Sequence, residues 1–401
     1  MSEVPEGWRI EPLRELVDAR GITYGVVQPG PFVEDGVPLV RVSDFKSDGI
    51  RREALVRIDP AIAARYGRST LSGSEVLITL VGTVGLVAVA TDELAGCNVA
   101  RAVGVVPLSD PLTARWVALS LQGKSVRRYF VDRLNTTVQK TLNLRDVASL
   151  RIPCPPAPEM RTITELLGAL DDKIESNTRV ARAGLDVMRL DFDRRFGPTG
   201  ELMQPCQALE TVAEVVMGQS PPGATYSADS ADGMPMVQGM GAFGERFVEP
   251  TTFTSSPTKV VAAGTLLMTV RAPVGSLNLT TERTCVGRGV AALATEWPAF
   301  VECSLREMAP RWQSEAGGTI YPSVNGRQVR EAPVTAADRA DVDAFEEFAT
   351  PLRDRALALH HEARHLTAIR DALLPRLVSG RIRAPLTNDL DEAVETVLDA
   401  A

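Results

Sequence analysis

The sequence predicts an α+β fold in which two tandem domains of similar structure are separated by two long antiparallel helices. Three features support this prediction. Residues 158–196 and 336–377 carry apolar or small residues at heptad spacing, which is typical of long paired helices. A series of short strand-and-turn motifs precedes each stretch, and the series occurs twice in the same order. The repeat of roughly 180–200 residues is too long for a solenoid, so it indicates a tandem duplication related by pseudo-twofold symmetry.

Both heptad stretches have a narrow apolar seam. In the first it consists of Ile163, Leu167, Leu170, Ile174, Ala181, Gly184 and Met188, and in the second of Val342, Phe345, Ala349, Leu352, Ala356, Leu359, Ala363, Leu366, Leu373 and Leu377. A lone helix with such a seam is unstable in water, so we expect the two to form an antiparallel coiled coil. Each helix would span roughly 55–60 Å at about 1.5 Å per residue.

Asn177 occupies the one gap in the first seam. A buried Asn can fix the register of a coiled coil. The alternative is a polar residue at a solvated break in the seam.

The repeated motifs predict buried strands joined by tight turns. Residues 35–43 correspond to 232–240, 74–86 to 263–276, 98–106 to 286–293, and 140–147 to 322–329. In the first pair, Asp-Gly before a Val/Met-Pro step marks a turn that enters a strand. In the second pair, an apolar run, a turn with Gly or Pro and another apolar run predict a hairpin.

The net charge of −8 is unevenly distributed. Residues 20–151 contain 17 Lys/Arg and 12 Asp/Glu, whereas residues 201–335 contain 9 and 13. The last stretch, residues 388–401, has five acidic residues and no basic one. A protein that binds DNA tightly by itself normally has a more basic surface, so any DNA binding would be shared with a basic partner.

The sequence has no feature of an exported or membrane protein. Its first residues lack the basic-then-apolar pattern of a signal peptide, and the apolar run at residues 76–90 is interrupted by Gly82 and Gly85. Five scattered cysteines, Cys97, Cys154, Cys206, Cys285 and Cys303, form no CxxC pair, so neither a zinc ribbon nor a disulfide framework is indicated. We expect a cytoplasmic protein that contacts no membrane.

The order of the motifs resembles the specificity subunit of Type I restriction–modification systems, the HsdS family. The segments that carry the resemblance are GVPLVRVSDF, VLITLVGTVG, NVARAV and KTLNLRDVASLRIPCPP, followed by a heptad helix and then by a second, similar series. The resemblance covers nearly the whole chain. Two segments depart from it: residues 331–337 replace the Pro-rich residues 152–158, and the acidic tail matches no motif of the family.

This resemblance implies a domain organisation. Residues 1–155 and 198–335 would be two target recognition domains, each reading one half of a split double-stranded DNA site. Residues 156–197 and 336–384 would be the conserved spacer helices, and residues 385–401 an acidic tail. Successive turns of B-DNA that face the same way lie about 34–36 Å apart, so two readers need a fixed separation, which a rigid helical pair provides.

The resemblance also implies the partners. Two methyltransferase subunits would dock on this chain, and restriction subunits would join them in phage defence. Because the non-seam faces of the two helices are only partly charged, we expect the outer faces of the helical pair to be the docking surface, with Arg353, Arg355 and Arg364 as candidates. This chain would be non-catalytic and bind no cofactor. S-adenosylmethionine would be held by the methyltransferase, and ATP and Mg by the restriction subunit.

Base readout favours Arg, Lys, Asn, Gln and small hydroxyl residues on loops or strand ends. The candidate DNA-binding residues are Arg41, Ser43, Asp44, Lys46, Thr83, Asn98, Arg101, Gln139 and Lys140 in the first repeat, and Gln238, Arg271, Asn278, Arg288 and Tyr321 in the second. The alternative for each is a phosphate contact or a solvated loop residue.

Two other functions are weighed against this one. His361, Glu362 and His365 fit the H-E-x-x-H zinc protease pattern, but the two His are expected to point away from the seam, and no third His ligand is present besides the adjacent His360. A duplicated protein-binding scaffold would fit the acidic second repeat. The chain has no Asn/Asp-Pro-Pro-Tyr tetrapeptide and no complete Walker A motif, which indicates that it supplies specificity rather than catalysis.

Overall fold

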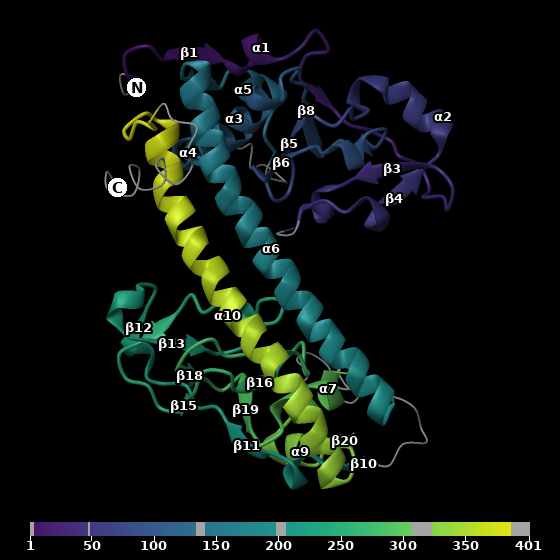
Figure 1. The fold of residues 1–401 in the computed structure, drawn as a ribbon, viewed down its shortest axis with the longest axis vertical. Coiled ribbons are helices and arrows are strands. Elements are labelled where there is room, and N and C mark those ends of the chain that lie inside the picture. The colour runs from purple at the N-terminus through teal and green to yellow at the C-terminus, as the bar shows by residue number, and fades with distance from the viewer. Residues whose placement is uncertain (1–3, 47–48, 134–140, 198–205, 307–322, 386–401) are drawn as a thin grey trace. The chain divides into compact units, whose positions relative to one another are not determined.

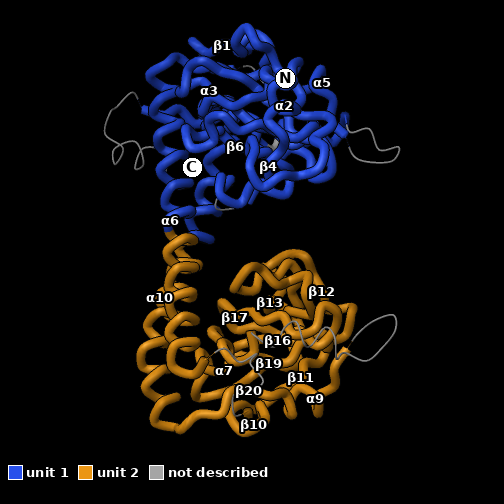
Figure 2. Tube along the Cα trace, turned by 90° about the vertical axis from the view of Figure 1, so that its right-hand side faces the viewer, with its two compact units in different colours: residues 1–176, 363–401 blue, residues 177–362 orange. Residues whose placement is uncertain are grey.

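The computed structural model describes residues 4–46, 49–133, 141–197, 206–306 and 323–385 and confirms the α+β fold (Figure 1). The chain divides into two compact units (Figure 2). Unit 1 contains residues 1–176 and 363–401, and unit 2 contains residues 177–362. Each unit therefore includes a segment of both long helices.

Unit 1 is built on three small sheets. The four-stranded sheet has the order β2 (Thr23–Tyr24), β8 (Val103–Val106), β5 (Val76–Thr79), β6 (Val87–Val89), and all its pairs are antiparallel. The second sheet has the order β4 (Val56–Ile58), β3 (Val37–Val40), β7 (Asn98–Val99), with β3 and β7 parallel, and the third pairs β1 (Arg9–Pro12) with β9 (Arg151–Cys154). The shorter helices are α1 (Leu13–Leu16), α2 (Pro60–Ala63), α3 (Pro111–Gln122), α4 (Lys124–Val131) and α5 (Leu144–Ala148).

Unit 2 repeats this topology. Its sheets have the orders β11 (Glu214–Met217), β19 (Val290–Ala294), β16 (Leu266–Thr269), β17 (Leu277–Leu279); β12 (Tyr226–Ser227), β14 (Phe253–Thr254), β13 (Met234–Val237), β18 (Thr284–Val286), β15 (Val260–Val261); and β10 (Cys206–Ala208), β20 (Pro333–Thr335). Helices α7 (Pro298–Arg306) and α9 (Gly326–Arg330) correspond to α3 and α5. Strands β12 and β15 lie at the edges of their sheet and are additional to the topology described for unit 1.

The duplication extends to individual hydrogen bonds. The Thr79 hydroxyl donates to the Thr83 carbonyl, and the Thr269 hydroxyl donates to the Pro273 carbonyl, both at 2.6 Å. Each of these Thr residues ends a central strand and closes the predicted hairpin through its own backbone as well. The two hairpins therefore share one turn design despite different sequences.

The two predicted long helices are α6 (Ala157–Phe196) and α10 (Arg339–Val378). Helix α6 begins next to Pro158, a residue that the first helical turn accepts because its missing N–H would have no partner there. In unit 1, Ile163 and Leu167 of α6 share a core with Leu377 of α10, whereas in unit 2 Phe192 of α6 shares a core with Phe345 of α10. Since the start of each helix pairs with the end of the other, the pairing is antiparallel, as predicted.

The buried seam of α6 differs in part from the predicted one. In unit 2 it passes through Ala181, Leu185, Met188 and Phe192, and the predicted Gly184 is only half-buried. A straight helix drifts by about 20° per heptad against a strict seven-residue repeat, so the buried line moves by one position along the helix. Asn177 is buried with its Nδ2 atom unpaired among the described residues, so the solvated break is wrong, and a role in register stays a prediction.

A buried carboxylate ties together three distant segments of unit 1. Glu159, at the start of α6, is 1% exposed and accepts a hydrogen bond from the Trp8 indole at 3.0 Å. Arg383, beyond the end of α10, donates to both oxygens of this carboxylate at 2.6 and 2.9 Å. The Glu159 side chain thus links the segment that contains Trp8 and the segment that follows α10 to the start of α6.

Equivalent glycines allow two loops to approach closely. A Cβ on Gly25 would lie 2.0 Å from the Val99 carbonyl oxygen, and a Cβ on Gly218 would lie 2.2 Å from the Gly287 carbonyl oxygen. No side chain fits in either place.

No helix among the described residues is long and apolar enough to cross a bilayer.

Gly218→Ala should therefore destabilise unit 2 by about 1–3 kcal/mol, because the added methyl group overlaps a backbone carbonyl. Urea unfolding of the purified chain measures the change. Gly223→Ala is the control, since a Cβ at that position meets no atom within 4 Å. Equal stability of Gly218→Ala and the wild type would contradict the close approach.

Candidate nucleic-acid interface

Three loops of each unit converge through backbone hydrogen bonds. In unit 1, the Ala100 amide donates to the Val40 carbonyl at 2.8 Å, and the Leu80 amide donates to the Ala102 carbonyl at 2.7 Å. These bonds join the loop after β3, the β5–β6 hairpin turn and the β7–β8 turn. We name residues 41–46, 80–86 and 100–102, and the equivalent residues 238–242, 270–276 and 287–289 of unit 2, the interface loops.

The same bonds in unit 2 run from the Gly287 amide to the Val237 carbonyl at 2.8 Å and from the Val270 amide to the Gly289 carbonyl at 2.9 Å. Two candidate residues flank the first bond in each unit. They are Arg41 and Arg101 in unit 1, and Gln238 and Arg288 in unit 2. The fold thus brings together, at equivalent positions, residues that lie some 50–60 positions apart in the chain.

In unit 1, neighbouring residues hold Arg41 in place. Its guanidinium is paired with Asp44, with a shortest distance of 3.1 Å, and lies 5.8 Å from the centre of the exposed Phe32 ring. Asp44 therefore orients Arg41, and Ser43 donates a hydrogen bond to the same carboxylate. Arg101 is exposed and has no side-chain hydrogen bond or ion pair among the described residues.

Lys46 and Thr83 also lie exposed on the interface loops of unit 1. The Thr83 carbonyl accepts the hydrogen bond from the Thr79 hydroxyl within the hairpin turn, and the Thr83 side chain is exposed.

In unit 2, two residues that the sequence analysis did not select support the interface loops. Ser220 accepts hydrogen bonds from the Arg288 amide and from its Nε atom, at 3.2 and 3.4 Å. Tyr226 accepts a hydrogen bond from Gln238 Nε2 at 2.6 Å. The signal for Ser220 was the segment Gly-Gln-Ser-Pro-Pro at residues 218–222, which aligns with Gly-Val-Val-Gln-Pro at residues 25–29.

Arg271 is exposed and follows Val270, whose amide contacts the β18–β19 turn. The corresponding position in unit 1 is Val81, which forms the matching bridge to Thr141 as Arg271 does to Ser323. The two units therefore differ in the charge that they present at this position.

Asn98 and Asn278 are not exposed to a DNA duplex, which corrects their selection from the sequence. Asn98 is 0% exposed, accepts hydrogen bonds from the Ser69 hydroxyl and the Val99 amide, and donates to two carbonyls. Asn278 is 3% exposed and donates to the Gly244 and Leu277 carbonyls. Both lie within strands. The Asn98 amide satisfies the carbonyls of residues 63 and 66, and the Asn278 amide reaches the Gly244 carbonyl, contacts that the sequence does not show to be close.

The remaining candidates, Gln139, Lys140 and Tyr321, lie outside the described residues.

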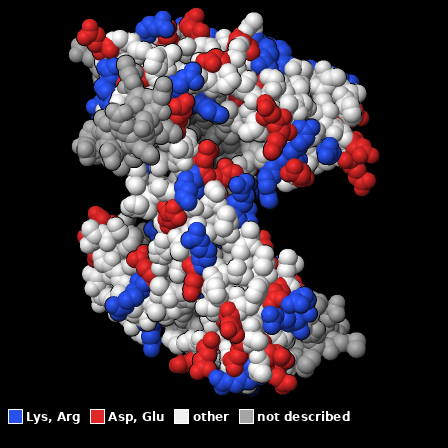
Figure 3. Space-filling model, in the orientation of Figure 1, with Lys and Arg blue, Asp and Glu red and all other residues white. Residues whose placement is uncertain are grey.

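The surface charge is mixed. On the face shown in Figure 3, Lys and Arg side chains are mixed with Asp and Glu side chains.

Arg353, expected on the outer face of α10, is 8% exposed and faces inward, where it pairs with the buried Glu302 of α7 at 3.5 Å. Arg306 pairs with the same carboxylate at 2.7 Å. Arg353 is therefore part of the core, whereas Arg355 and Arg364 are exposed as expected.

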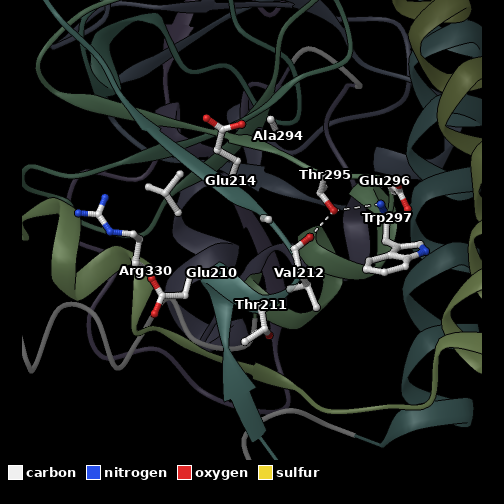
Figure 4. A pocket seen from close by; sticks show the side chains of 11 residues that line it. Glu210, Thr211, Val212, Glu214, Ala294, Thr295, Glu296, Trp297 and Arg330 are labelled. Carbon is white, nitrogen blue, oxygen red and sulfur yellow. Dashed lines mark hydrogen bonds between the residues drawn. The ribbon is translucent and has the colours of Figure 1, made fainter.

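A pocket of about 610 Å³ lies at the opposite end of β11 and β19 from the interface loops (Figure 4). Three carboxylates, Glu210, Glu214 and Glu296, line it together with Arg330. Thr295 organises its wall by donating to the Val212 carbonyl and accepting from the Trp297 amide. This acidic lining would repel phosphates, so the pocket is not part of a DNA interface.

Two histidines of α10, His360 and His361, pack within unit 2. His361 Nε2 lies 3.0 Å from the Thr281 carbonyl oxygen, and the His360 ring stacks on Phe247 with centres 4.4 Å apart. Within the described ranges, no group of three or more His, Cys, Asp or Glu side chains is placed to hold a metal ion.

No known protein-family profile matches the chain. It is 22% identical over 410 residues to the putative type I restriction enzyme MjaX specificity subunit of Methanocaldococcus jannaschii, covering 96% of this chain and 95% of the relative. It is 30% identical over 185 residues to the type I restriction enzyme EcoBI specificity subunit of Escherichia coli, covering 45% of this chain and 39% of the relative.

Among solved structures, the fold is similar to the type I restriction–modification system S subunit from M. genitalium, with a TM-score of 0.58 at 15% identity over 94% of this chain and 97% of that chain. The fold is thus that of a specificity subunit with tandem domains. The predicted resemblance to type I specificity subunits, which are non-catalytic, is confirmed, and it supports a role in DNA sequence specificity.

Asn98→Ala should destabilise unit 1 by about 1–3 kcal/mol, because Ser69 and nearby backbone groups lose buried hydrogen bonds. Thermal unfolding measures this effect. Arg101→Ala, on the neighbouring exposed turn, should leave stability within about 0.5 kcal/mol of the wild type. Equal stability of Asn98→Ala and the wild type would contradict this structural role of Asn98.

Proposed function

We propose that this chain is the DNA sequence-specificity subunit of a type I restriction–modification complex, and that each unit reads one half of a bipartite site. The observation that carries the proposal is that, in both units, an equivalent backbone hydrogen bond between two interface loops is flanked by two candidate residues. Identical backbone hydrogen bonds present Arg41 and Arg101 in unit 1, but Gln238 and Arg288 in unit 2. One scaffold with different side chains suits two half-sites of different sequence.

Polar residues of the interface loops that are exposed, or half-buried as Arg41 is, are the proposed DNA contacts. Arg41, Arg101, Gln238, Arg271 and Arg288 have the donor and acceptor groups that base edges require. Ser43, Lys46 and Thr83 suit contacts to phosphates, which fix the register of a protein on DNA without reading sequence. The two long helices would set the distance between the half-sites, leaving the bases between them unread.

Methyltransferase subunits are proposed to dock on the long helices. Helix α6 has a second apolar stripe, Val180, Ala183, Val187 and Leu190, at three- and four-residue spacing. The three large side chains of this stripe are 50%, 48% and 67% exposed, in order along the helix. A stripe of this kind on an otherwise charged helix suits a partner surface. The methyltransferase would bind S-adenosylmethionine, and joining restriction subunits would bind ATP and Mg.

Mapping of methylated bases in cells that co-express this chain with a methyltransferase subunit of its own system tests the specificity role. We expect N6-methyladenine at a split motif with a gap of fixed length, and no such methylation without this chain. Methylation at an unsplit motif, or methylation that does not depend on this chain, would contradict the proposal and favour the protein-binding scaffold.

Substitution of the apolar stripe tests docking. Val187→Lys together with Leu190→Lys should weaken assembly with the methyltransferase about tenfold, since each change places a charge in an apolar contact. Thermal stability of the free chain should stay unchanged because both side chains are exposed. Val131→Lys, a similar change at a 65% exposed site on α4, is the control, and equal assembly of all three proteins would exclude this docking face.

A further inference from the structure

Gln238 is the end of a short chain of hydrogen bonds in unit 2. Its Nε2 atom donates to the Tyr226 hydroxyl at 2.6 Å, and that hydroxyl donates to the Pro221 carbonyl at 2.9 Å. Pro221 is buried in the loop after β11, so the chain of bonds is anchored in the body of the unit. Gln238 itself is exposed and follows the last residue of β13.

The direction of these bonds is fixed by chemistry. The Pro221 carbonyl can only accept, so it takes the single proton of the Tyr226 hydroxyl. The Tyr226 oxygen must then accept from its other neighbour, which requires the nitrogen of the Gln238 amide to face it. This nitrogen also lies 3.7 Å from the Met236 sulfur, a weak acceptor. The carbonyl end of the amide, Oε1, is thereby turned away from Tyr226.

Oε1 is in a position to meet a ligand. No described residue donates a hydrogen bond to it, and the Gln238 side chain borders a pocket of about 380 Å³ that Tyr226, Met240 and Thr251 also line. The backbone carbonyl of Gln238 lies beside Gly289, and a Cβ on Gly289 would come within 1.9 Å of this backbone oxygen. Gln238 is therefore held against the turn that carries Arg288.

We propose that Gln238 reads an exocyclic amino group, N6 of adenine or N4 of cytosine, in the half-site of unit 2, and that Tyr226 is the residue that positions it. This inference rests on the proposed function. In the major groove, adenine and cytosine present an amino donor where thymine and guanine present a carbonyl acceptor. A Gln held with Oε1 outward accepts from the first pair and faces an acceptor in the second.

The equivalent position of unit 1 has the opposite polarity. Arg41 carries only donors, and Asp44 occupies part of its guanidinium while leaving the rest of the fork available. The base at the matching position of the other half-site should therefore present acceptors, as guanine does. The two units would therefore prefer different bases at this position because one has Arg41 where the other has Gln238.

Base preference at each position of the methylated motif, measured with the assembled methyltransferase complex, tests the inference. For the wild type, one position of the half-site of unit 2 should carry adenine or cytosine on the strand that Gln238 faces, and therefore thymine or guanine on the opposite strand. Gln238→Met, which keeps the shape and removes the amide, should reduce discrimination at this position by about tenfold and leave the other half-site unchanged.

Tyr226→Phe tests the positioning role separately, because the amide of Gln238 stays but is free to turn. Discrimination should weaken at the same position, with the thermal stability of the chain nearly unchanged. Tyr129→Phe in unit 1 is the control, since its hydroxyl likewise donates to a backbone carbonyl, that of Asp146, but lies outside the interface loops. It should leave every base preference as in the wild type.

Two results would overturn the inference and leave the proposed function intact. One is an unchanged split motif with Gln238→Met and Tyr226→Phe. The other is relaxation that falls in the half-site of unit 1 and not in that of unit 2. Should Gln238→Met not assemble, Tyr226→Phe decides alone, because relaxation within the half-site of unit 2 supports the inference and an unchanged motif contradicts it. A wild-type complex that gives no split motif would instead contradict the proposed function itself.

Discussion

The seam between α6 and α10 is the interaction on which both units depend. Neither helix could bury a narrow apolar stripe alone, and neither globular core is complete without them. In unit 2, Phe192 of α6 lies against Phe345 of α10 and Phe300 of α7, with ring centres 5.6 Å apart in each case. In unit 1, Ile163 and Leu377 join the core that contains Trp116. Cores and helices are therefore one cooperative structure within each unit.

Duplication on such a framework separates stability from recognition. The Thr79 and Thr269 turns, the close approaches at Gly25 and Gly218 and the backbone bonds between interface loops are the same in both units. Side chains on the loops differ at two equivalent positions, Arg41 against Gln238 and Val81 against Arg271, whereas Arg101 and Arg288 are the same. Substitutions at these positions alter donors and acceptors without disturbing buried groups, so recognition can diverge while the fold stays constant.

The repeats, the long helices and their antiparallel pairing could be predicted because each leaves a pattern that is local in sequence. The errors among the site residues share one cause, which is a partner far away in the chain. Arg353 is indistinguishable from Arg355 by helix spacing alone, and only the buried Glu302 of α7 explains why one faces inward. Asn98 resembles a loop-edge polar residue until the carbonyls of residues 63 and 66 are placed beside it. Tyr226 and Ser220 likewise gain meaning only through contacts across unit 2.

The carboxylate of Glu159 has a consequence for biosynthesis. Unit 2 is a continuous segment, residues 177–362, and can fold as soon as that segment has left the ribosome. Unit 1 is different, because Glu159 is neutralised by Arg383 and its core needs Leu373 and Leu377. While some two hundred further residues are translated, the apolar side chains in the first half of α6 lack their partners from α10. During the same time, Glu159 lacks Arg383. The part of the protein that is made first is completed last, and this interval is when the nascent chain is most exposed to aggregation or to capture by a chaperone.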